Sequence, residues 1–199
     1  MSNRTIFLAS GNRGKLNELR RLLPGIDVVG TADVPGWQAP PETADSFEGN
    51  ALIKARAGCA ASGLPTLADD SGLAVDVLNG MPGVRSARWS GPEATDEGNV
   101  KLLLAQLSDV GVERRAGRFQ CAVAVVFPDG TELVETGTMP GHLAFEPEGD
   151  HGFGYDPIFV PDGETRTTAQ LSAEEKDAIS HRGQALRAVI PEVKTRLED

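Results

Sequence analysis

At residues 5–23 the chain reads TIFLASGNRGKLNELRRLL, and this stretch decides the kind of fold to expect. Residues 5–9 form a short, apolar, β-prone run. A turn with two glycines follows at residues 10–14, and leucines then recur at helical spacing up to Leu23. A strand, a glycine loop and a helix in this order are typical of a sheet with helices packed against it.

Outward from this stretch, the chain continues to mix strand and helix patterns. Asp45 or Ser46 can cap a second helix that ends at Gly63, and Ser172 opens a capping box for a helix toward His181. The other expected elements are a strand at 26–30, strands at 66–68 and 73–78 separated by DDSG at 69–72, a turn at 79–80, a helix at 95–107, a hairpin of strands at 119–127 and 131–138, and a helical stripe at 186–197 that Pro191 kinks or restarts. Without repeats or a clear linker, residues 1–199 are predicted to form a single α/β or α+β domain.

Composition and charge narrow the class of protein. Hydrophobic residues make up 40% of the chain and charged residues 24%, as in ordinary globular domains. With 19 basic and 29 acidic residues the net charge is −10, which repels an extended nucleic-acid backbone, so no DNA or RNA partner is expected. A small polyphosphate remains compatible, because salt screens charges more than about 8–10 Å away.

The sequence also indicates where the protein works. No apolar run approaches the roughly 18 residues of a membrane span, and the N-terminus has no signal-peptide cleavage site. We therefore expect a cytoplasmic protein with no membrane partner. Cys59 and Cys121 lie far apart within apolar stretches and are interpreted as core residues, although the sequence alone leaves a disulfide open.

The glycine loop is the first candidate for substrate binding. Because Ser10 to Lys15 follow a strand and open a helix, backbone N–H groups and the positive helix end can meet phosphate oxygens there, and Lys15 adds a charge. The spacing is not that of a P-loop, since Ala9 and Leu16 stand where a glycine and a Mg²⁺-binding Ser or Thr are required. The alternative is a tight strand-to-helix turn without a ligand.

Two adjacent carboxylates, Asp69 and Asp70, are the second candidate. They follow a buried-looking strand, where carboxylates are costly unless they meet a cation or strong donors. Mg²⁺ suits them, because it prefers hard oxygen ligands and shares its shell between one or two carboxylates and substrate phosphates. The alternative is an ordinary turn capped by an aspartate.

Two further segments toward the C-terminus can meet a nucleotide. GFGYDP at 152–157 places two aromatic rings and two glycines where a base can stack, and the alternative is a loop whose rings close onto the core. Lys176, His181 and Arg182 bring two permanent cations and a titratable ring close together near Ser180, whereas a solvated helix face is the alternative for Lys176. His142 and His151 are interpreted as structural.

Together these segments resemble the inosine triphosphate pyrophosphatase family over nearly the whole chain. The shared motifs, as they stand here, are SGNRGK at 10–15, ET at 42–43 with FEGNA at 47–51 and KA at 54–55, LADDSGL at 67–73, GFGYDP at 152–157, and EK at 175–176 with SHRG at 180–183. Each motif alone is weak evidence for this resemblance, whereas five motifs in the same order are specific to the family.

The resemblance implies a fold, an activity and an assembly. The fold is α/β, with an elongated mixed central β-sheet flanked by helices and two lobes with an active-site cleft between them. The activity is Mg²⁺-dependent hydrolysis of the purine nucleoside triphosphates ITP, dITP and XTP to the monophosphate and pyrophosphate. This removes nonstandard nucleotides before they enter DNA or RNA. The assembly is usually a homodimer.

The resemblance also implies roles for single residues. Glu42 and Asp70 are the expected Mg²⁺ ligands, and Asp70 is also the base that activates water. The expected substrate-binding residues are Ser10, Gly11, Asn12, Arg13, Gly14 and Lys15 on the triphosphate, Lys54 as a further cation, Ser71, and Phe153, Gly154, Tyr155, Asp156, Lys176, His181 and Arg182 on the nucleotide, the last two near the base. The segment 131–147 carries no motif and is assigned no chemistry.

Two other functions remain open from the sequence. One is a pyrophosphatase that prefers dUTP or modified pyrimidine triphosphates, which a substrate panel would separate. The other is a non-catalytic protein that binds ITP without Mg²⁺-dependent turnover. Two adjacent carboxylates together with a glycine loop favour catalysis over mere binding.

Overall fold

The computed structural model describes residues 4–198, except for the side chains of Arg13 and Glu18. The described chain forms two compact units. Unit 1 contains residues 4–70, 122–136 and 185–198, and unit 2 contains residues 71–121 and 137–184. Neither unit is a continuous segment, because three long strands and the last helix each begin in one unit and end in the other.

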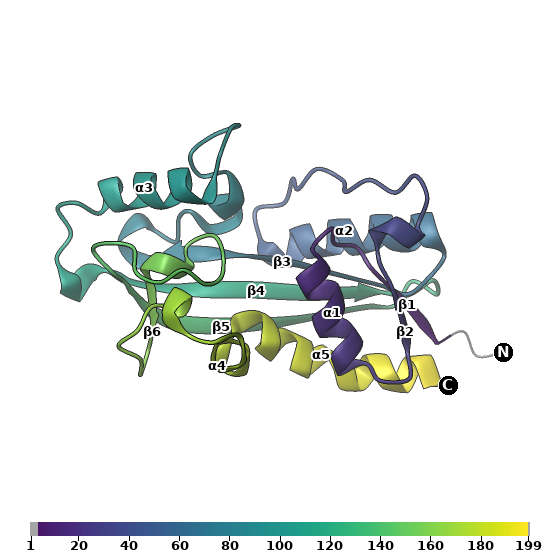
Figure 1. The fold of residues 1–199 in the computed structure, drawn as a ribbon. Coiled ribbons are helices and arrows are strands. Elements are labelled where there is room, and N and C mark those ends of the chain that lie inside the picture. The colour runs from purple at the N-terminus through teal and green to yellow at the C-terminus, as the bar shows by residue number, and fades with distance from the viewer. Residues whose placement is uncertain (1–3, 199) are drawn as a thin grey trace. The chain divides into compact units, whose positions relative to one another are not determined.

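Six strands form one mixed sheet in the order β2-β1-β3-β4-β5-β6 (Figure 1). β1 pairs in parallel with β2 and β3, whereas β5 and β6 are antiparallel. The strands are β1 Thr5–Leu8, β2 Asp27–Val29, β3 Thr66–Val75, β4 Ala116–Val126, β5 Glu132–Leu143 and β6 Phe159–Pro161. The predicted α/β class with a mixed sheet flanked by helices is confirmed.

Each of the first four α-helices begins at a side-chain cap that the sequence supplies. Asn12, Ser46, Thr95 and Ser172 accept hydrogen bonds from backbone N–H groups in the first turn. The helices are α1 Arg13–Leu22, α2 Phe47–Ser62, α3 Asp96–Gln106, α4 Ala173–Ile179 and α5 His181–Glu198. Six 3₁₀ helices within residues 4–198 connect them: Thr31–Asp33, Asp76–Leu78, Gly83–Arg88, Val112–Arg114, Asp156–Ile158 and Thr168–Gln170.

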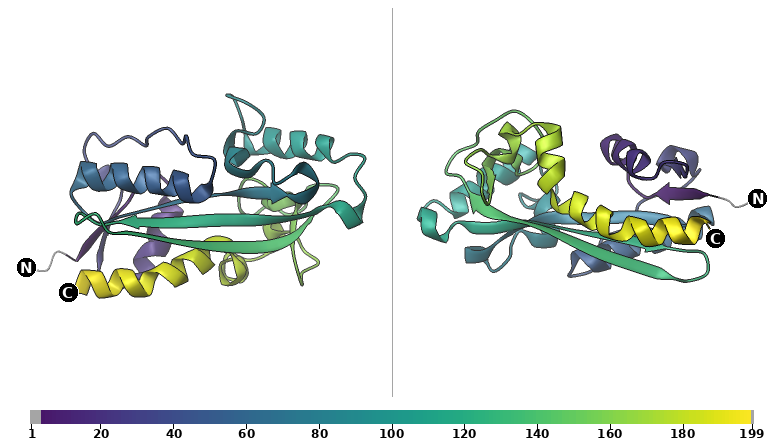
Figure 2. Two further views of the ribbon diagram at one scale, coloured as in Figure 1. Left: turned by 180° about the vertical axis from the view of Figure 1, so that it is seen from behind. Right: turned by 90° about the horizontal axis from the view of Figure 1, so that it is seen from below.

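The structure decides several open points about these helices. Ser46, not Asp45, caps α2, and Gly63 ends it in the left-handed region at a φ of 69°. Pro191 lies inside α5 and does not end or restart it. In unit 1, α2 lies on the opposite side of the strands from α5 (Figure 2).

The strand predictions need two corrections. The first concerns β3, which runs unbroken through the DDSG segment from Thr66 and ends at Val75, where a 3₁₀ helix at Asp76–Leu78 replaces the end of the strand expected at 73–78. Buried aspartates are tolerated inside this strand because each finds a cationic partner. The second correction concerns β5, which extends past the expected residue 138 to Leu143, where residues 141–143 pair with β6. The turn at Asn79 and Gly80 is confirmed by their positive φ angles of 53° and 82°.

Unit 1 packs around unusually small side chains. Ala51 and Ala55 of α2 and Ala122 and Ala124 of β4 are fully buried together with Phe7. Small residues let α2 lie close to the sheet, and Gly58 marks the closest approach. A Cβ atom on Gly58 would stand 2.6 Å from Cγ2 of Thr66 and 3.0 Å from a ring carbon of Phe7.

Unit 2 has a core of larger side chains. Leu73, Leu103 and Leu107 are fully buried against Phe119 and Phe159, whose ring centroids are 4.6 Å apart. Cys59 and Cys121 are both buried and form no disulfide, which agrees with their interpretation as core residues. Of the helices at residues 4–198, none combines the length and the apolarity that crossing a membrane would take.

We expect Gly58→Ala to lower the free energy of unfolding by up to about 2 kcal/mol. Overpacking against Thr66 and Phe7 costs about 1–3 kcal/mol, of which alanine regains roughly 1 kcal/mol in helix propensity. Urea denaturation measures the change. Ala60→Ser, at an exposed position of the same helix, is the control and should stay within about 0.5 kcal/mol of the unaltered protein. A more stable Gly58→Ala variant would contradict the close packing of α2.

Candidate active site

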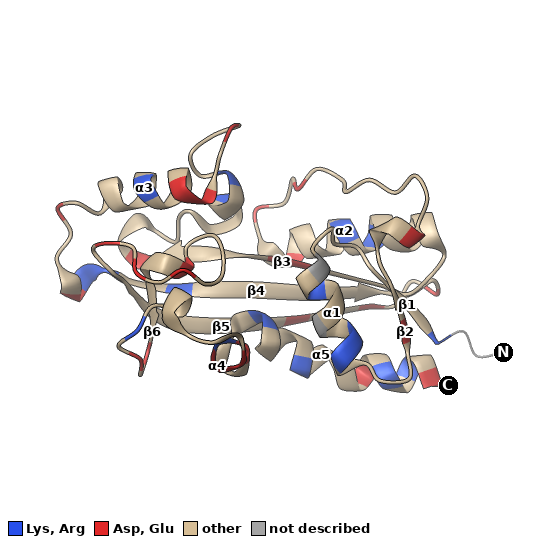
Figure 3. Ribbon diagram, viewed as in Figure 1, with Lys and Arg blue, Asp and Glu red and all other residues tan. Residues whose placement is uncertain are grey.

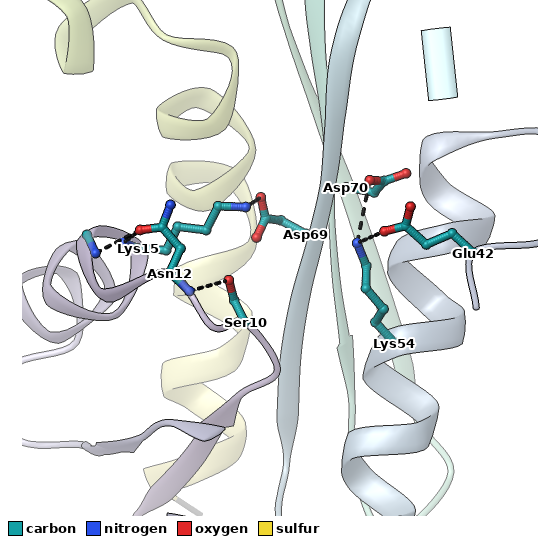
Figure 4. Close-up of polar contacts among 8 residues, drawn as sticks. Ser10, Asn12, Lys15, Glu42, Lys54, Asp69 and Asp70 are labelled. Carbon is teal, nitrogen blue, oxygen red and sulfur yellow. Dashed lines mark hydrogen bonds and ion pairs between the residues drawn. The ribbon is translucent and has the colours of Figure 1, made fainter. Parts of the chain in front are cut away.

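Adjacent carboxylates on β3 lie on opposite faces of the strand, each beside a lysine (Figure 4). Successive side chains of a strand alternate between its faces, so Asp69 and Asp70 cannot point the same way. Asp69 accepts a hydrogen bond from Nζ of Lys15 on α1 at 2.7 Å. Asp70 instead faces Lys54 of α2, at 3.5 Å. The two aspartates therefore belong to different groups and do not form one metal-binding pair.

The group around Asp70 contains the predicted metal ligands. Lys54 donates to Oε1 of Glu42 at 2.7 Å and lies 3.5 Å from Oδ1 of Asp70, so its ammonium bridges the two carboxylates. These three side chains are mostly buried, with exposed fractions of 12% for Lys54, 12% for Asp70 and 26% for Glu42. Lys54 lies on α2, Asp70 on β3 and Glu42 in the loop before α2, and Figure 3 colours the charged residues along the ribbon.

Burial and charge set the protonation of this group. Burial raises the pKa of Asp70 above 3.8 and outweighs the lowering by Lys54, while Glu42 raises it further. For Lys54, burial alone would lower the pKa, but Asp70 and Glu42 outweigh it and raise the pKa above 10.5. Lys54 is therefore charged at neutral pH, and Asp70 has a higher proton affinity than an ordinary aspartate.

The donor set at Glu42 and Asp70 fits Mg²⁺. Two carboxylates supply hard oxygens, and Mg²⁺ commonly binds through one or two carboxylates while substrate phosphates and water complete its shell. The bridging ammonium shows that the pair already accommodates a positive charge. Across the side chains that the structure describes, no group of three or more His, Cys, Asp or Glu is placed to hold a metal.

The glycine loop has a more specific geometry than the sequence indicated. Oδ1 of Asn12 accepts hydrogen bonds from the N–H groups of Gly14 at 2.8 Å and Lys15 at 3.3 Å, and Oγ of Ser10 accepts from the N–H of Asn12 at 3.3 Å. Of the loop amides that were expected to hold phosphate, those of Gly14 and Lys15 are thus capped by Asn12. A phosphate bound at these two amides would have to displace this side chain. Gly11 is exposed, and the side chain of Arg13 lies outside the described part of the structure.

In unit 2, Asp156 is the centre of the second group of predicted residues. Its side chain is 4% exposed and accepts hydrogen bonds at both oxygens. Oδ1 accepts from the hydroxyl of Thr168 at 2.9 Å, and Oδ2 accepts from the N–H of Phe153 at 2.8 Å and from Nζ of Lys176 at 2.5 Å. Asp156 therefore holds Lys176 and the loop in place and has no free face for a base.

The two aromatic residues of GFGYDP differ in exposure. Phe153 is 59% exposed, and the ammonium of Lys176 lies 5.2 Å from its ring centroid. Tyr155 is buried in the core of unit 2, and its hydroxyl donates to the carbonyl of Ser86 at 2.9 Å. Of these two rings, only Phe153 offers a face on which a base can stack. The N–H of Gly154 donates to Asp96 at 2.7 Å.

The remaining predicted residues lie at the start of α5 and on β3. The ring of His181 stacks on Phe119, with centroids 5.1 Å apart and planes 9° from parallel. Arg182 is partly buried, and Oγ of the buried Ser180 accepts the N–H of Gly183 at 3.0 Å. Ser71 is partly buried on β3, next to Asp70 in sequence. Residues 176 to 182 thus combine two cationic side chains with a ring that stacks on Phe119.

Sequence reasoning assigned no role to three residues in these groups. Asn50 is fully buried in α2 and donates to Asp70, Thr168 donates to Asp156, and Asp96 accepts from the loop amide of Gly154. Asn50 gave two advance signals: it lies within the FEGNA motif at 47–51, and it is a polar residue among the small apolar residues of its helix. Thr168 and Asp96 reach their partners from distant parts of the sequence and gave none.

We expect the free energy of unfolding of Asp70→Asn to increase relative to that of the unaltered protein as the pH rises. The pKa of Asp70 is higher in the folded than in the unfolded chain, so the folded state binds the proton more tightly. Its contribution to stability is full below pH 3.8 and is lost as the pH rises through the raised pKa. The variant has no carboxyl at this position and therefore does not lose this stability. The loss in the unaltered protein is about 1.4 kcal/mol for each unit by which the pKa of Asp70 is higher in the folded than in the unfolded chain.

Urea denaturation in Mg²⁺-free buffer between pH 3 and pH 7 measures this difference. The free energy of unfolding of Asp70→Asn minus that of the unaltered protein should increase and then level off. A difference that decreases with pH would mean that Lys54 lowers the pKa of Asp70 by more than burial raises it.

Known proteins match both the sequence and the fold. The sequence model of the Ham1 family matches residues 6–192. A dITP/XTP pyrophosphatase of Cutibacterium acnes is 56% identical and is aligned over 97% of this chain and 98% of its own length. Another of Streptomyces coelicolor is 52% identical over 96% of this chain and 98% of its own.

Two solved structures extend the comparison to the fold. The Ham1 protein of Staphylococcus aureus has a TM-score of 0.90 at 38% identity, covering 96% of this chain and 99% of that one. A nucleoside-triphosphatase, or dITP/XTP pyrophosphatase, of Mycobacterium abscessus has a TM-score of 0.81 at 56% identity, covering 94% and 99%. By sequence and by fold, therefore, the chain belongs to the Ham1 family.

Proposed function

We propose that this protein hydrolyses the nonstandard purine nucleoside triphosphates ITP, dITP and XTP to the monophosphate and pyrophosphate, with Mg²⁺ bound at Glu42 and Asp70. The observation that carries the proposal is the buried group in which Lys54 bridges these two carboxylates. The names of the two relatives described above, dITP/XTP pyrophosphatases at 56% and 52% identity, support the same activity.

Unit 1 carries the groups that suit a triphosphate. Lys15 and Lys54 are permanent cations, and each is already held by a carboxylate, so little side-chain entropy is lost when a phosphate binds. Ser10, Gly11 and the capped amides of α1 supply further donors once Asn12 rotates away. Arg13 and Ser71 are proposed to contact the substrate on the strength of their motifs alone.

The chemical step needs a base and an electrophilic phosphorus. Asp70 accepts a proton from water, the water oxygen attacks the α-phosphorus, and the bond from that phosphorus to the bridging oxygen breaks with pyrophosphate as leaving group. Its raised pKa suits Asp70 to this transfer, because a base gains strength as its pKa approaches the working pH. Mg²⁺, when bound, supplies neutralisation of the phosphate charge and a template for the reacting oxygens.

Unit 2 carries the groups that suit a nucleoside. Phe153 offers an exposed ring for stacking, and Asp156 and Thr168 hold Lys176 beside it. Donors from His181 and Arg182 would favour a 6-keto purine, because a 6-amino group would leave a donor facing a donor. Gly154 and Tyr155 are proposed to contribute to nucleoside binding through the backbone of their loop.

Two broader aspects belong to the same proposal. The activity would remove nonstandard purine nucleotides before their incorporation into DNA or RNA, in the cytoplasm, with neither nucleic acid nor membrane as a partner. The protein would act as a homodimer, as the family resemblance implies. A preference for dUTP or modified pyrimidine triphosphates is the competing assignment, and a panel of nucleotides assayed for pyrophosphate release separates the two.

The products of ITP hydrolysis test the position of attack. We expect IMP and pyrophosphate, and in ¹⁸O-labelled water the label should appear in IMP, because the water oxygen bonds to the α-phosphorus. Chromatography and mass spectrometry of one reaction give both results. Label in pyrophosphate would move the attack to the β-phosphorus, and IDP as the first product would refute the pyrophosphatase assignment while leaving nucleotide binding intact.

The role of Asp70 can be tested separately. Asp70→Asn should lower kcat for ITP by at least about 10²-fold, since the amide accepts no proton and a positioned base contributes about 10²–10⁴-fold. Asp27→Asn removes a carboxylate from an exposed position on β2 and should leave kcat unchanged. Near-normal turnover by Asp70→Asn would exclude Asp70 as the base.

A further inference from the structure

Asn50 is a buried amide that touches the proposed catalytic group without facing solvent. It lies in the first turns of α2 with an exposed fraction of 0%. Its Nδ2 donates to Oδ2 of Asp70 at 3.1 Å. Neither the mechanism above nor the family resemblance gives this residue a task.

Asn50 and Lys54 hold Asp70 from the same helix face. Residues four apart in a helix lie one above the other, so both side chains of α2 reach the same strand residue. Asn50 contacts Oδ2 of Asp70, and Lys54 lies 3.5 Å from Oδ1. The two carboxylate oxygens are therefore held by different donors, which fixes the rotation of the carboxylate about its bond to Cβ.

The other end of the same amide fixes the segment that carries Glu42. Oδ1 of Asn50 accepts the N–H of Ala44 at 3.0 Å, two residues from Glu42. This contact also fixes which way the amide faces, because only its oxygen can accept from Ala44 and only its nitrogen can donate to Asp70. One side chain thus links both carboxylates of the proposed metal site.

An amide is suited to this position because it is neutral and can both donate and accept a hydrogen bond. A carboxylate at position 50 would repel Asp70, and an ammonium could not accept from Ala44. An alkyl side chain would leave both the Ala44 N–H and one side of Asp70 without this partner, and each buried polar group left unsatisfied is costly. Asparagine meets both requirements and stays neutral.

We infer that Asn50 is a positioning residue for the Glu42–Asp70 pair: it holds Asp70 in the orientation that proton transfer requires and keeps Glu42 at the matching distance for the metal. The inference rests on the proposed function, since it assigns Asn50 a task in that reaction. Partners that orient metal ligands typically contribute 10–100-fold to metal affinity or activity.

The test replaces Asn50 by leucine, which removes both hydrogen bonds at similar volume, and separately by alanine in case leucine prevents folding. Asn99→Leu and Asn99→Ala are the matched controls. Asn99 is also a buried asparagine, at the equivalent position of α3, and it bonds Ser90 and the Ser86 carbonyl rather than Asp70. Measurements are made well below each variant's unfolding temperature.

Three quantities are compared: kcat and KM for ITP, the dissociation constant for Mn²⁺ measured by electron paramagnetic resonance with and without α,β-methylene ITP, and the unfolding temperature. We expect the Asn50 variants to lose 10–100-fold in kcat and about 10-fold or more in Mn²⁺ affinity. The Asn99 variants should lose unfolding temperature but keep their Mn²⁺ affinity.

The outcomes separate this inference from the proposed function. If the unaltered protein hydrolyses ITP and the Asn50 variants match it in kcat and Mn²⁺ affinity, the positioning role is overturned. Losses in the Asn50 variants that the Asn99 variants share equally would overturn it as well, because destabilisation alone would then explain them. If the unaltered protein neither hydrolyses ITP nor binds Mn²⁺, the proposed function itself fails and the inference falls with it.

Discussion

The arrangement of the candidate site depends on the alternation of side chains along β3. Two carboxylates in the middle of a buried strand would each be costly to desolvate, and next to one another on the same face they would also repel. Alternation sends Asp69 to one face and Asp70 to the other, where Lys15 and Lys54 compensate them separately. Because the lysines come from α1 and α2, the same ion pairs also hold these two helices to the strand.

In unit 2, a single buried carboxylate is likewise compensated by a lysine and by hydrogen-bond donors. Asp156 is as deeply buried as Asp69, and its cost is offset by a lysine, a hydroxyl and a backbone amide. Its neighbour Gly152 has a φ of 81°, and a Cβ there would stand 2.1 Å from Oδ2 of Asp156, so only glycine fits. In both units, then, buried acids fix the cations and loops proposed to meet the substrate.

Local patterns predicted most of the fold, because caps, glycine stops and periodicity act over a few residues. The strand, loop and helix at residues 5–23, the cap at Ser172 and the turn at Asn79 could all be found this way. The continuity of β3 could not be predicted, since DDSG consists of turn-forming residues. Its aspartates are stabilised within a strand by Lys15 and Lys54, which are distant in sequence. The burial of Tyr155 and the contacts of Asn50 likewise depend on partners elsewhere in the sequence. The candidate residues could be found from their motifs, whereas which of them lie together is decided by tertiary contacts.

The cap on α1 has a consequence for which anions can reach the glycine loop. Asn12 is an intramolecular competitor tethered two and three residues from the two amides that it caps, so its effective concentration there is on the order of millimolar or higher. Under the proposed function, a lone orthophosphate or sulfate would offer little beyond the bonds that Asn12 already makes, whereas a polyphosphate would gain further contacts with cations when it displaces the cap. The cap would therefore favour ligands with several phosphates over simple anions.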